Sequence, residues 1–321
     1  MARPHPYSLP MVALAKWAQK NLARQIKSPC VLACDFATNN SLLTSGDGAE
    51  LQVLDRRTGR LTRTLQLPPR TRNAFDFRKF VFSDDGVFVA GYNPTEKIFA
   101  VWSMSDGDLK MACEGAGQIA PAMVFMPGGR IVVCDGPRIS THMLTGELLH
   151  YTPTSDDLRS IALFAPPNPK PFIVAIGVFR KGFGGHQMQS MRIENGIVTQ
   201  KTEGPIRARP DKANVTRTIE IKEAINVPGL TARILVINQE ERFEVKHEDP
   251  ADPPGERYIT RLSAVDPAKG AFYSNEVTLE GRHCLEVAGA ELHVVDEMGR
   301  FRRVAGFPFR IEEADWRLIA S

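Results

Sequence analysis

The chain has 321 residues, of which 43% are hydrophobic and 24% charged, and its formal net charge is +3. This composition is ordinary for a folded globular protein and excludes a long disordered or low-complexity chain. A net charge this small creates no whole-molecule field that would by itself require a nucleic acid or a membrane as partner. No stretch approaches the roughly 18 consecutive apolar residues of a membrane span, so no span is expected.

An amphipathic helix is predicted near the N-terminus, over residues 8–27. Ser8 suits its N-cap, and Pro10 falls near the first helical position, where a missing N–H costs no hydrogen bond. Apolar residues then recur every three or four positions, with a basic stripe beside them. The stripe and the aromatic residue within it supply the candidate partner-binding residues Lys16, Trp17, Lys20 and Arg24.

A basic amphipathic helix with no acidic residue before Asp35 has three interpretations. It docks along the rest of the chain or on a protein partner, which is the interpretation we favour. It is a mitochondrial targeting segment, since that class is also basic and acid-poor. Alternatively it contacts an anionic surface, either membrane lipid or RNA.

From residue 29 onward the sequence predicts only strands and tight turns. Period-2 alternation marks the strands, and Asp85-Gly86 is a strong hairpin signal. The first unit has predicted strands over 31–36, 41–46, 50–55 and 61–67, and the second over 77–82, 87–91, 98–102 and 109–113. The third and fourth units follow in the same way up to residue 199.

A short phrase recurs in these units: an apolar pair ends a strand, and a polar turn with glycine follows. The turn glycines are Gly59, Gly107, Gly146 and Gly196, and the phrase returns near Gly299. A repeat of about 40 to 50 residues that contains only strands and turns predicts the blades of a β-propeller. The predicted fold class is therefore all-β, a single propeller of four-stranded blades.

Beyond residue 200 the repeat loses its register. Strands are predicted over 215–221, 232–237 and 258–265, with a Pro-rich surface loop over 246–255. This region is either one blade carrying the loop or two compressed blades. A last hairpin over 284–296 and a strand over 300–307 bring the visible units to six, and we favour seven in total. Residues 311–319 are predicted to form a short helix or a strand that closes the ring.

Several of these residues resemble WD40-type propellers. Residues 43–55 resemble the family's small-Gly-Asp turn and third strand, with Leu54 in place of the usual Trp, while Trp102 keeps that residue in the second unit. No unit has a complete Trp-Asp pair, so the chain resembles a degenerate WD40-like propeller. The predicted domains are an N-terminal extension (1–28), the propeller (29–310) and a C-terminal tail (311–321).

No motif of a hydrolase, a P-loop or a zinc protease is present. The Gly-rich segment 181–186 lacks a following helix, so we interpret it as a hairpin turn and not as a ligand loop. His283 and His293 could face each other in a hairpin, but a single pair without a carboxylate is more often packing. The predicted inner strands are apolar except for isolated charges at Asp35, Arg78 and Arg159. We therefore expect no catalytic residue, metal or cofactor.

The five cysteines show no disulfide or metal spacing, which indicates small buried side chains in a reducing compartment. We accordingly expect an intracellular protein, cytoplasmic in preference to mitochondrial. Two local basic groups are interpreted as solvated blade edges, with RNA or an acidic partner as the alternative. They comprise Arg56, Arg57, Arg60 and Arg63, and Arg300, Arg302 and Arg303 with Phe301.

The predicted function is a non-enzymatic scaffold for protein–protein interactions, as a subunit of a larger complex. Arg56 and Arg57 join the four helix residues as candidate contacts. Asp47, Asp55 and Arg57 also resemble the pattern that some WD40 proteins present to a cullin-ligase adaptor. One alternative is a ribonucleoprotein component that uses the basic helix and the arginines on RNA. A propeller hydrolase or lyase is the other.

Overall fold

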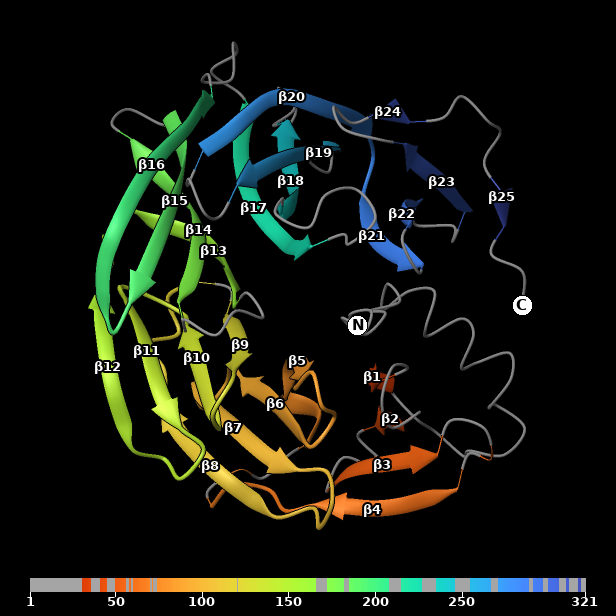
Figure 1. Ribbon diagram of the computed structural model, residues 1–321. Coiled ribbons are helices and arrows are strands. Elements are labelled where there is room, and N and C mark those ends of the chain that lie inside the picture. The colour runs from red at the N-terminus through yellow and green to blue at the C-terminus, as the bar shows by residue number, and fades with distance from the viewer. Residues whose placement is uncertain are drawn as a thin grey trace. The chain divides into compact units, whose positions relative to one another are not determined.

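The computed structural model consists almost entirely of antiparallel strands, which Figure 1 colours in chain order. The structure describes residues 31–35, 41–44, 50–55, 58, 60–69, 71, 74–119, 121–165, 172–181, 185–207, 215–226, 235–245, 255–266, 271–288, 291–296, 300–305, 310–311 and 317–318. Within these residues there is one 3₁₀ turn, η1 (Ala74–Asp76), and no α-helix. The helix predicted over 8–27 lies outside them.

The chain divides into two compact units, the first ending at Tyr151 and the second beginning at Thr152. Three sheets form the first unit, and strands adjacent in sequence are hydrogen-bonded neighbours in each. The first sheet consists of β1 (Val31–Asp35), β2 (Ser41–Thr44), β3 (Leu51–Asp55) and β4 (Leu61–Leu65). The second consists of β5 (Arg78–Phe82), β6 (Phe88–Asn93), β7 (Ile98–Ser103) and β8 (Leu109–Glu114). The third consists of β9 (Ala122–Met126), β10 (Arg130–Cys134), β11 (Arg138–Met143) and β12 (Leu148–Pro153).

Successive sheets of the first unit pack through the apolar residues of their strands. Leu43 and Val53 of the first sheet share one buried cluster with Val89 and Trp102 of the second. A second cluster joins the second and third sheets through Tyr92, Phe99, Val101, Met123, Ile131 and Val133. Because side chains alternate across a strand, each sheet can bury one face against the sheet before it and one against the sheet after it. This stacking confirms the first three units predicted from the sequence.

Trp102, the residue that resembles the family's tryptophan, joins the first two sheets. Its fully buried indole donates from Nε1 to the carbonyl oxygen of Gln66, at 2.6 Å. The ring packs edge to face against Phe77, with 5.2 Å between the centroids. The Gln66 N–H in turn donates to the Gly107 carbonyl at 3.0 Å. The tryptophan is thus satisfied both as an apolar ring and as a hydrogen-bond donor.

Asp135 fulfils a comparable role between the second and third sheets. Its buried carboxylate accepts the N–H groups of Ala116 and Gly117 at 2.8 and 2.7 Å, and the Tyr92 hydroxyl at 2.9 Å. Burial and this contact with Asp135 raise the pKa of the Tyr92 phenol. Because every partner donates to the carboxylate, its removal from water is compensated.

Three further sheets form the second unit. The fourth consists of β13 (Leu158–Phe164), β14 (Ile173–Lys181), β15 (Gly185–Glu194) and β16 (Ile197–Arg207). The fifth consists of β17 (Val215–Asn226), β18 (Leu235–Val245), β19 (Gly255–Asp266) and β20 (Ala271–Glu280). The sixth consists of β21 (His283–Ala288), β22 (Glu291–Asp296), β23 (Arg300–Ala305) and β24 (Arg310–Ile311), with β25 (Arg317–Leu318) also paired to β23.

The region that was ambiguous in sequence, residues 200–280, holds the end of β16 and one sheet of long strands. β17 and β19 each have 12 residues, whereas β3 and β4 each have 5. The extra residues therefore lengthen one blade and do not build a second. Most of the loop predicted over 246–255 lies outside the described residues, and Gly255 already pairs with Val245 in the sheet.

The six sheets correspond to the six units visible in the sequence, and the described residues hold no seventh sheet. The turn glycines Gly107, Gly146 and Gly196 have φ of 83°, 92° and 78° and separate the third and fourth strands of their sheets. In the sixth sheet the recurring apolar pair is at the end of the second strand, β22, whereas in those sheets it is at the end of the third strand. Strands β24 and β25 agree with the strand alternative for the C-terminal segment, while the domain boundaries stay a prediction.

Replacing Gly107 with alanine is expected to destabilise the first unit. At a φ of 83°, the added Cβ would lie 2.4 Å from the carbonyl oxygen of Thr64 on the neighbouring sheet. Gly129→Ala is the matched control, because Gly129 has a φ of 68° and nothing within 4 Å of a Cβ. We expect G107A to lower the free energy of unfolding by about 1 to 3 kcal/mol more than G129A in urea titrations. Equal losses would contradict the close contact between the sheets.

Candidate functional site

The six residues predicted to bind partners are not among the described residues. They are Lys16, Trp17, Lys20, Arg24, Arg56 and Arg57. Of the neighbouring groups, Asp55 is described, and its carboxylate caps the following turn by accepting the N–H and hydroxyl of Thr58, both at 2.7 Å. The predicted partner residues therefore stay a prediction, and the site is built from other parts of the chain.

The two histidines considered as a metal pair lie on opposite faces of the sixth sheet. In the register of β21 and β22, His283 stands opposite Asp296, whereas His293 stands opposite Glu286. Residues three positions apart on a strand leave opposite faces, so these two rings cannot face each other. The expectation that they could was wrong, since the hairpin is offset by one residue. Within the described residues, no group of three or more His, Cys, Asp or Glu is placed to hold a metal.

His283 instead ties the sixth sheet to the fifth. Its backbone N–H donates to the hydroxyl of Thr260 at 3.0 Å, and its carbonyl accepts from the Asn238 amide at 3.0 Å. Thr260 also donates to the carbonyl of Gly281 at 2.8 Å. The His283 ring lies on the same side, with Nδ1 3.3 Å from the Thr260 hydroxyl.

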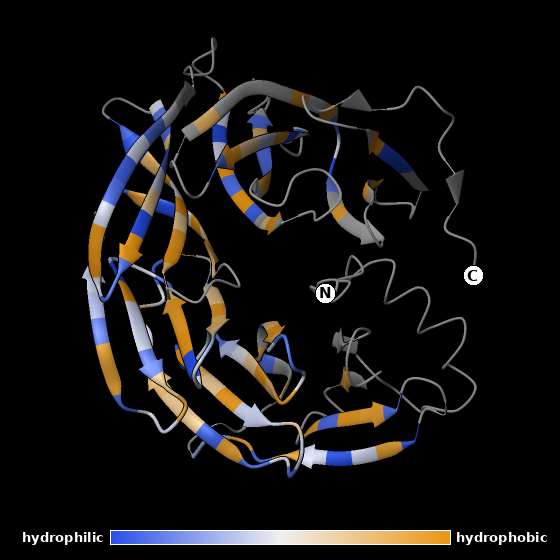
Figure 2. Cartoon of the chain, viewed as in Figure 1, coloured by the Kyte–Doolittle hydropathy of each residue, from blue (hydrophilic) through white to orange (hydrophobic). Residues whose placement is uncertain are grey.

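The strands of the fifth sheet each have an apolar half and a charged half. Along β17, apolar and polar residues alternate, as the orange and blue colours of Figure 2 show. In β18, buried Val236 and Ile237 give way to the run Glu240 to Arg242. The apolar half packs toward the fourth sheet through Ile219, Ile221, Ile237 and Val265, and toward the sixth through Val236, Leu262 and Ala264. We call residues 215–222, 239–245 and 255–261 the charged half of the fifth sheet; within it, Ile219 and Ile221 still pack against the fourth sheet.

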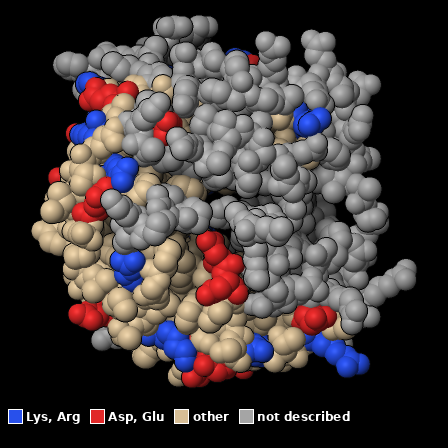
Figure 3. All heavy atoms as spheres, viewed as in Figure 1, with Lys and Arg blue, Asp and Glu red and all other residues tan. Residues whose placement is uncertain are grey.

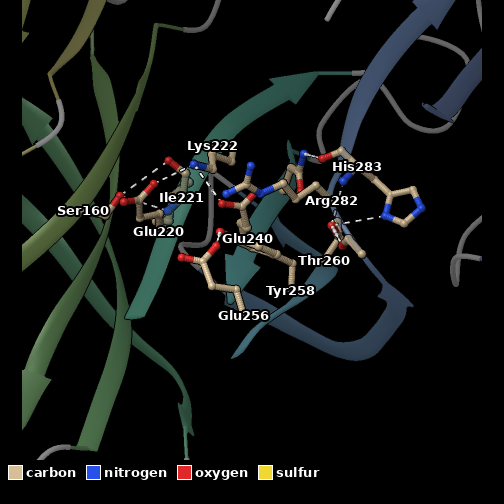
Figure 4. A network of polar contacts seen from close by, with 12 residues as sticks. Ser160, Glu220, Ile221, Lys222, Glu240, Glu256, Tyr258, Thr260, Arg282 and His283 are labelled. Atoms are coloured by element: carbon tan, nitrogen blue, oxygen red, sulfur yellow. Dashed lines mark hydrogen bonds and ion pairs between the residues drawn. The ribbon is translucent and has the colours of Figure 1, made fainter. Parts of the chain in front are cut away.

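One face of the charged half carries a network of ion pairs (Figure 4). It is the same face of the fifth sheet that, in the apolar half, packs toward the sixth sheet. Lys222 Nζ lies 2.6 Å from a Glu220 oxygen and 3.2 Å from a Glu240 oxygen. Burial opposes the charge of Lys222, but its hydrogen bonds and ion pairs with these two glutamates raise its pKa overall. Arg282 Nε lies 3.6 Å from the second oxygen of Glu240, so one carboxylate bridges two cations.

The network continues through an aromatic residue. The Arg282 guanidinium lies over the ring of Tyr258, 3.7 Å from its centroid, and the Tyr258 hydroxyl donates to Glu256. That hydrogen bond and those from Arg242 lower the pKa of the Glu256 carboxyl. Arg242 Nη2 also lies 2.5 Å from a Glu244 oxygen. Three cations thus face four carboxylates, and the network is close to neutral.

The opposite face of the charged half contains a buried ion triad. Glu241 is fully buried, and its two oxygens bind Arg217 Nη2 at 2.8 Å and Arg261 Nε at 2.9 Å. Only 9% of the Arg217 side chain is exposed, and its guanidinium lies 5.6 Å from the ring centroid of Phe243. The triad borders the apolar core toward the fourth sheet, because Glu241 stands directly opposite Ile219 in the register.

Sequence reasoning missed this site for an identifiable reason. A run such as Glu240-Glu241-Arg242 is typical of a solvated strand end, and nothing in it shows which residue is buried. The available signal was the alternation of Arg217, Ile219 and Ile221, which marks one face of β17. The residue of β18 that pairs with this face of β17 is Glu241, but the pairing of the two strands is known only from the structure.

Similar architectures occur among solved structures of very low identity. BamB from Moraxella catarrhalis is 10% identical over 88% of this chain and 86% of that chain, with a TM-score of 0.50. Hsv2 from Kluyveromyces lactis, with its loop 6CD replaced by a Gly-Ser linker, is 8% identical over 86% and 81%, with a TM-score of 0.52. A protein from Lactobacillus plantarum is 13% identical over 88% and 83%, with a TM-score of 0.55.

The fold is a degenerate WD40-like β-propeller. No protein-family model matches the chain, and no curated protein matches it either. These likenesses therefore concern the fold alone, and the function has to be argued from the residues. Within the described residues, no helix is long and apolar enough to cross a membrane.

The buried triad yields a stability prediction. Glu241→Gln removes the charge that neutralises two arginines, so we expect a loss of about 3 to 5 kcal/mol in the free energy of unfolding. Glu244→Gln is the matched control, because Glu244 lies in the same strand in an exposed pair with Arg242. That substitution should cost less than about 1 kcal/mol. Similar losses for the two variants in urea titrations would contradict the assignment of the triad as a buried, charge-compensated group.

Two cysteines yield a reactivity prediction. Burial raises the pKa of the Cys113 and Cys134 thiols to about 12 each, so roughly one thiol in ten thousand is ionised at pH 8. We expect neither residue to react with iodoacetamide in the native chain, as followed by mass spectrometry, and both to react in urea. The same shifts predict that folding stability falls as pH rises above about 8.5, where only unfolded thiols ionise. Rapid native alkylation would contradict the assignment.

Proposed function

We propose that this protein is a non-enzymatic interaction scaffold and a subunit of a larger complex, and that it holds a protein partner on the charged half of the fifth sheet. The observation that supports this proposal is the ion-pair network of Figure 4, on strands that extend beyond their apolar core. Apart from Ile219 and Ile221, such an extension adds little to the core that would explain its length. It does provide a recognition surface on a rigid element.

The chemistry of the network suits a protein surface. Its side chains already hold one another, so part of the conformational entropy that binding would cost is lost on folding. Tyr258 and Arg282 belong to the residue types enriched in interface centres, and they are stacked on each other. Ion pairs at the rim of such a surface specify orientation and partner more than they add affinity.

The charge balance favours a protein over a nucleic acid on this surface. The phosphate backbone of RNA binds to excess positive charge, whereas the network has three cations and four carboxylates. In the described part of the face shown in Figure 3, basic and acidic residues are likewise interspersed. We therefore propose a partner surface that itself bears both signs of charge.

The predicted residues outside the described part belong to the same proposal. Lys16, Trp17, Lys20 and Arg24 provide a basic, aromatic contact for a second partner surface, and Arg56 and Arg57 provide another. RNA remains the alternative occupant for these basic groups, because they lack the compensating carboxylates of the fifth sheet. Salt-dependent RNA binding that weakens when Lys16, Lys20 and Arg24 are neutralised would favour that alternative.

Charge reversal at Arg282 tests the scaffold proposal. The full chain is purified from native lysate as wild type, Arg282→Glu and Lys110→Glu, and co-purifying subunits are quantified by mass spectrometry. Lys110 is the matched control, a partly exposed lysine paired with Asp106 and Asp108 in the second sheet. We expect R282E to lower recovery of stoichiometric partners at least ~10-fold and K110E to leave it unchanged. A chain that carries no stoichiometric partner, or equal recovery with both variants, would refute the proposal.

A further inference from the structure

A second group of charged residues lies on the facing sides of the fourth and fifth sheets, apart from the network of Figure 4. We call Arg159 on β13, Arg180 on β14, His186 on β15 and Arg217 on β17 the cationic cluster. Arg180 and His186 are direct partners in the register of β14 and β15. The proposed scaffold function uses none of these four residues.

The register places the cluster at the end of the core shared by the two sheets. Val178 and Met188 are a register pair in the fourth sheet and belong to the apolar cluster that includes Ile219 of the fifth. Because side chains alternate along a strand, Arg180 and His186 continue the face formed by Val178 and Met188. Arg217 similarly continues the face of Ile219. Arg180, His186 and Arg217 therefore occupy one polar layer beyond a common apolar one. Arg159 precedes Ser160, which is the register partner of Val178 and accepts the Ile221 N–H of the fifth sheet at 2.9 Å.

The charges of this layer act on the imidazole of His186. Burial lowers the pKa of its imidazole, and the charges of Arg217, Arg159 and Arg180 lower it further, in that order. Glu241 is the carboxylate that opposes them. Three guanidinium groups and one carboxylate thus act on a single ring, and Arg261, which shares Glu241 with Arg217, adds a further positive charge on this face, so positive charge is in excess.

The cluster extends from the surface into the protein. Arg159 and Arg180 are exposed, His186 is half-buried and Arg217 is nearly buried. The Nδ1 atom of His186 is buried and has no hydrogen-bond partner. The cluster thus combines two exposed arginines, an arginine that Glu241 holds in place and a ring nitrogen without a hydrogen-bond partner. The Arg159 guanidinium donates from Nη1 to the backbone carbonyls of Asp156 and Leu158, at 3.2 and 3.3 Å.

We propose that the cationic cluster binds a phosphate group. A phosphate monoester carries close to two negative charges at neutral pH, which suits a cluster with positive charge in excess. Guanidinium groups bind phosphate oxygens with paired, charge-assisted hydrogen bonds. A carboxylate ligand matches less well, because the cluster already holds one carboxylate in Glu241 and the excess remains after it.

His186 takes part in this binding by changing its protonation. Without a bound anion, burial and the surrounding arginines lower the pKa of the imidazole and favour its neutral form. A bound phosphate offsets their charge, so the ring gains a proton from solvent and Nδ1 can donate to a phosphate oxygen. No bond is made or broken, and the ring returns to its neutral form when the anion leaves.

Titration of the full chain with inorganic phosphate tests the proposal. The readout is the side-chain NMR signal of His186 across pH, with sodium chloride of equal ionic strength as the screening control. We expect a saturable shift that chloride does not produce, and a rise of about one unit in the pKa of His186. A dissociation constant weaker than ~10 mM, or the same response to chloride, would overturn the proposal.

Paired substitutions locate the binding to the cluster. Arg159→Gln with Arg180→Gln removes two exposed charges and should weaken phosphate binding at least ~10-fold. Lys97→Gln with Arg138→Gln removes two exposed cations of the first unit and should leave binding unchanged. Equal affinity in both double variants would overturn the proposal, as would equal loss in both.

A short single-stranded RNA distinguishes the source of the phosphate. RNA that displaces inorganic phosphate, and whose binding depends on Arg159 and Arg180, would support the phosphate chemistry and assign it to a nucleic-acid backbone. RNA that leaves phosphate bound would support a free phosphate or a phosphate monoester.

Discussion

The charged half of the fifth sheet depends on the ion triad of Arg217, Glu241 and Arg261. A strand that extends beyond its apolar core must place side chains on both faces, and one of those faces still borders the fourth sheet. At Glu241 a carboxylate is removed from water, at a cost of several kcal/mol if it were alone. The two guanidinium groups offset that cost, and the sheet remains paired to its end.

The same triad separates two kinds of recognition on one sheet. Because the pleat sends alternate residues to opposite faces, Glu240 and Glu241 are neighbours in sequence but belong to different surfaces. On one face Glu240 helps to complete a nearly neutral network. On the other, Glu241 occupies one guanidinium of a cluster that keeps its positive excess. The first surface suits a partner with patterned charge, and the second suits an anion.

Most of the strands could be predicted from the sequence, since alternation and turn glycines are local signals. Trp102 could be singled out by its resemblance to the family, but its bond to Gln66 could not, because that contact joins residues of different sheets. His283 and His293 show the limit most clearly. A hairpin offset by one residue reverses the face of every side chain, and neither histidine carries information about that offset. The burial of Glu241 was hidden for the same reason.

Because the fifth sheet is divided into an apolar and a charged half, the free-energy cost of opening its hydrogen bonds differs between the two ends of each strand. The apolar half lies between two packed neighbours, so its hydrogen bonds break only when much of the second unit opens. The charged half has fewer apolar contacts and is held by ion pairs, buried on one face and exposed on the other, so its outer hydrogen bonds open at a lower free-energy cost. One end of each strand is therefore an anchor, while the other can adjust its shape to a ligand without loss of the anchor.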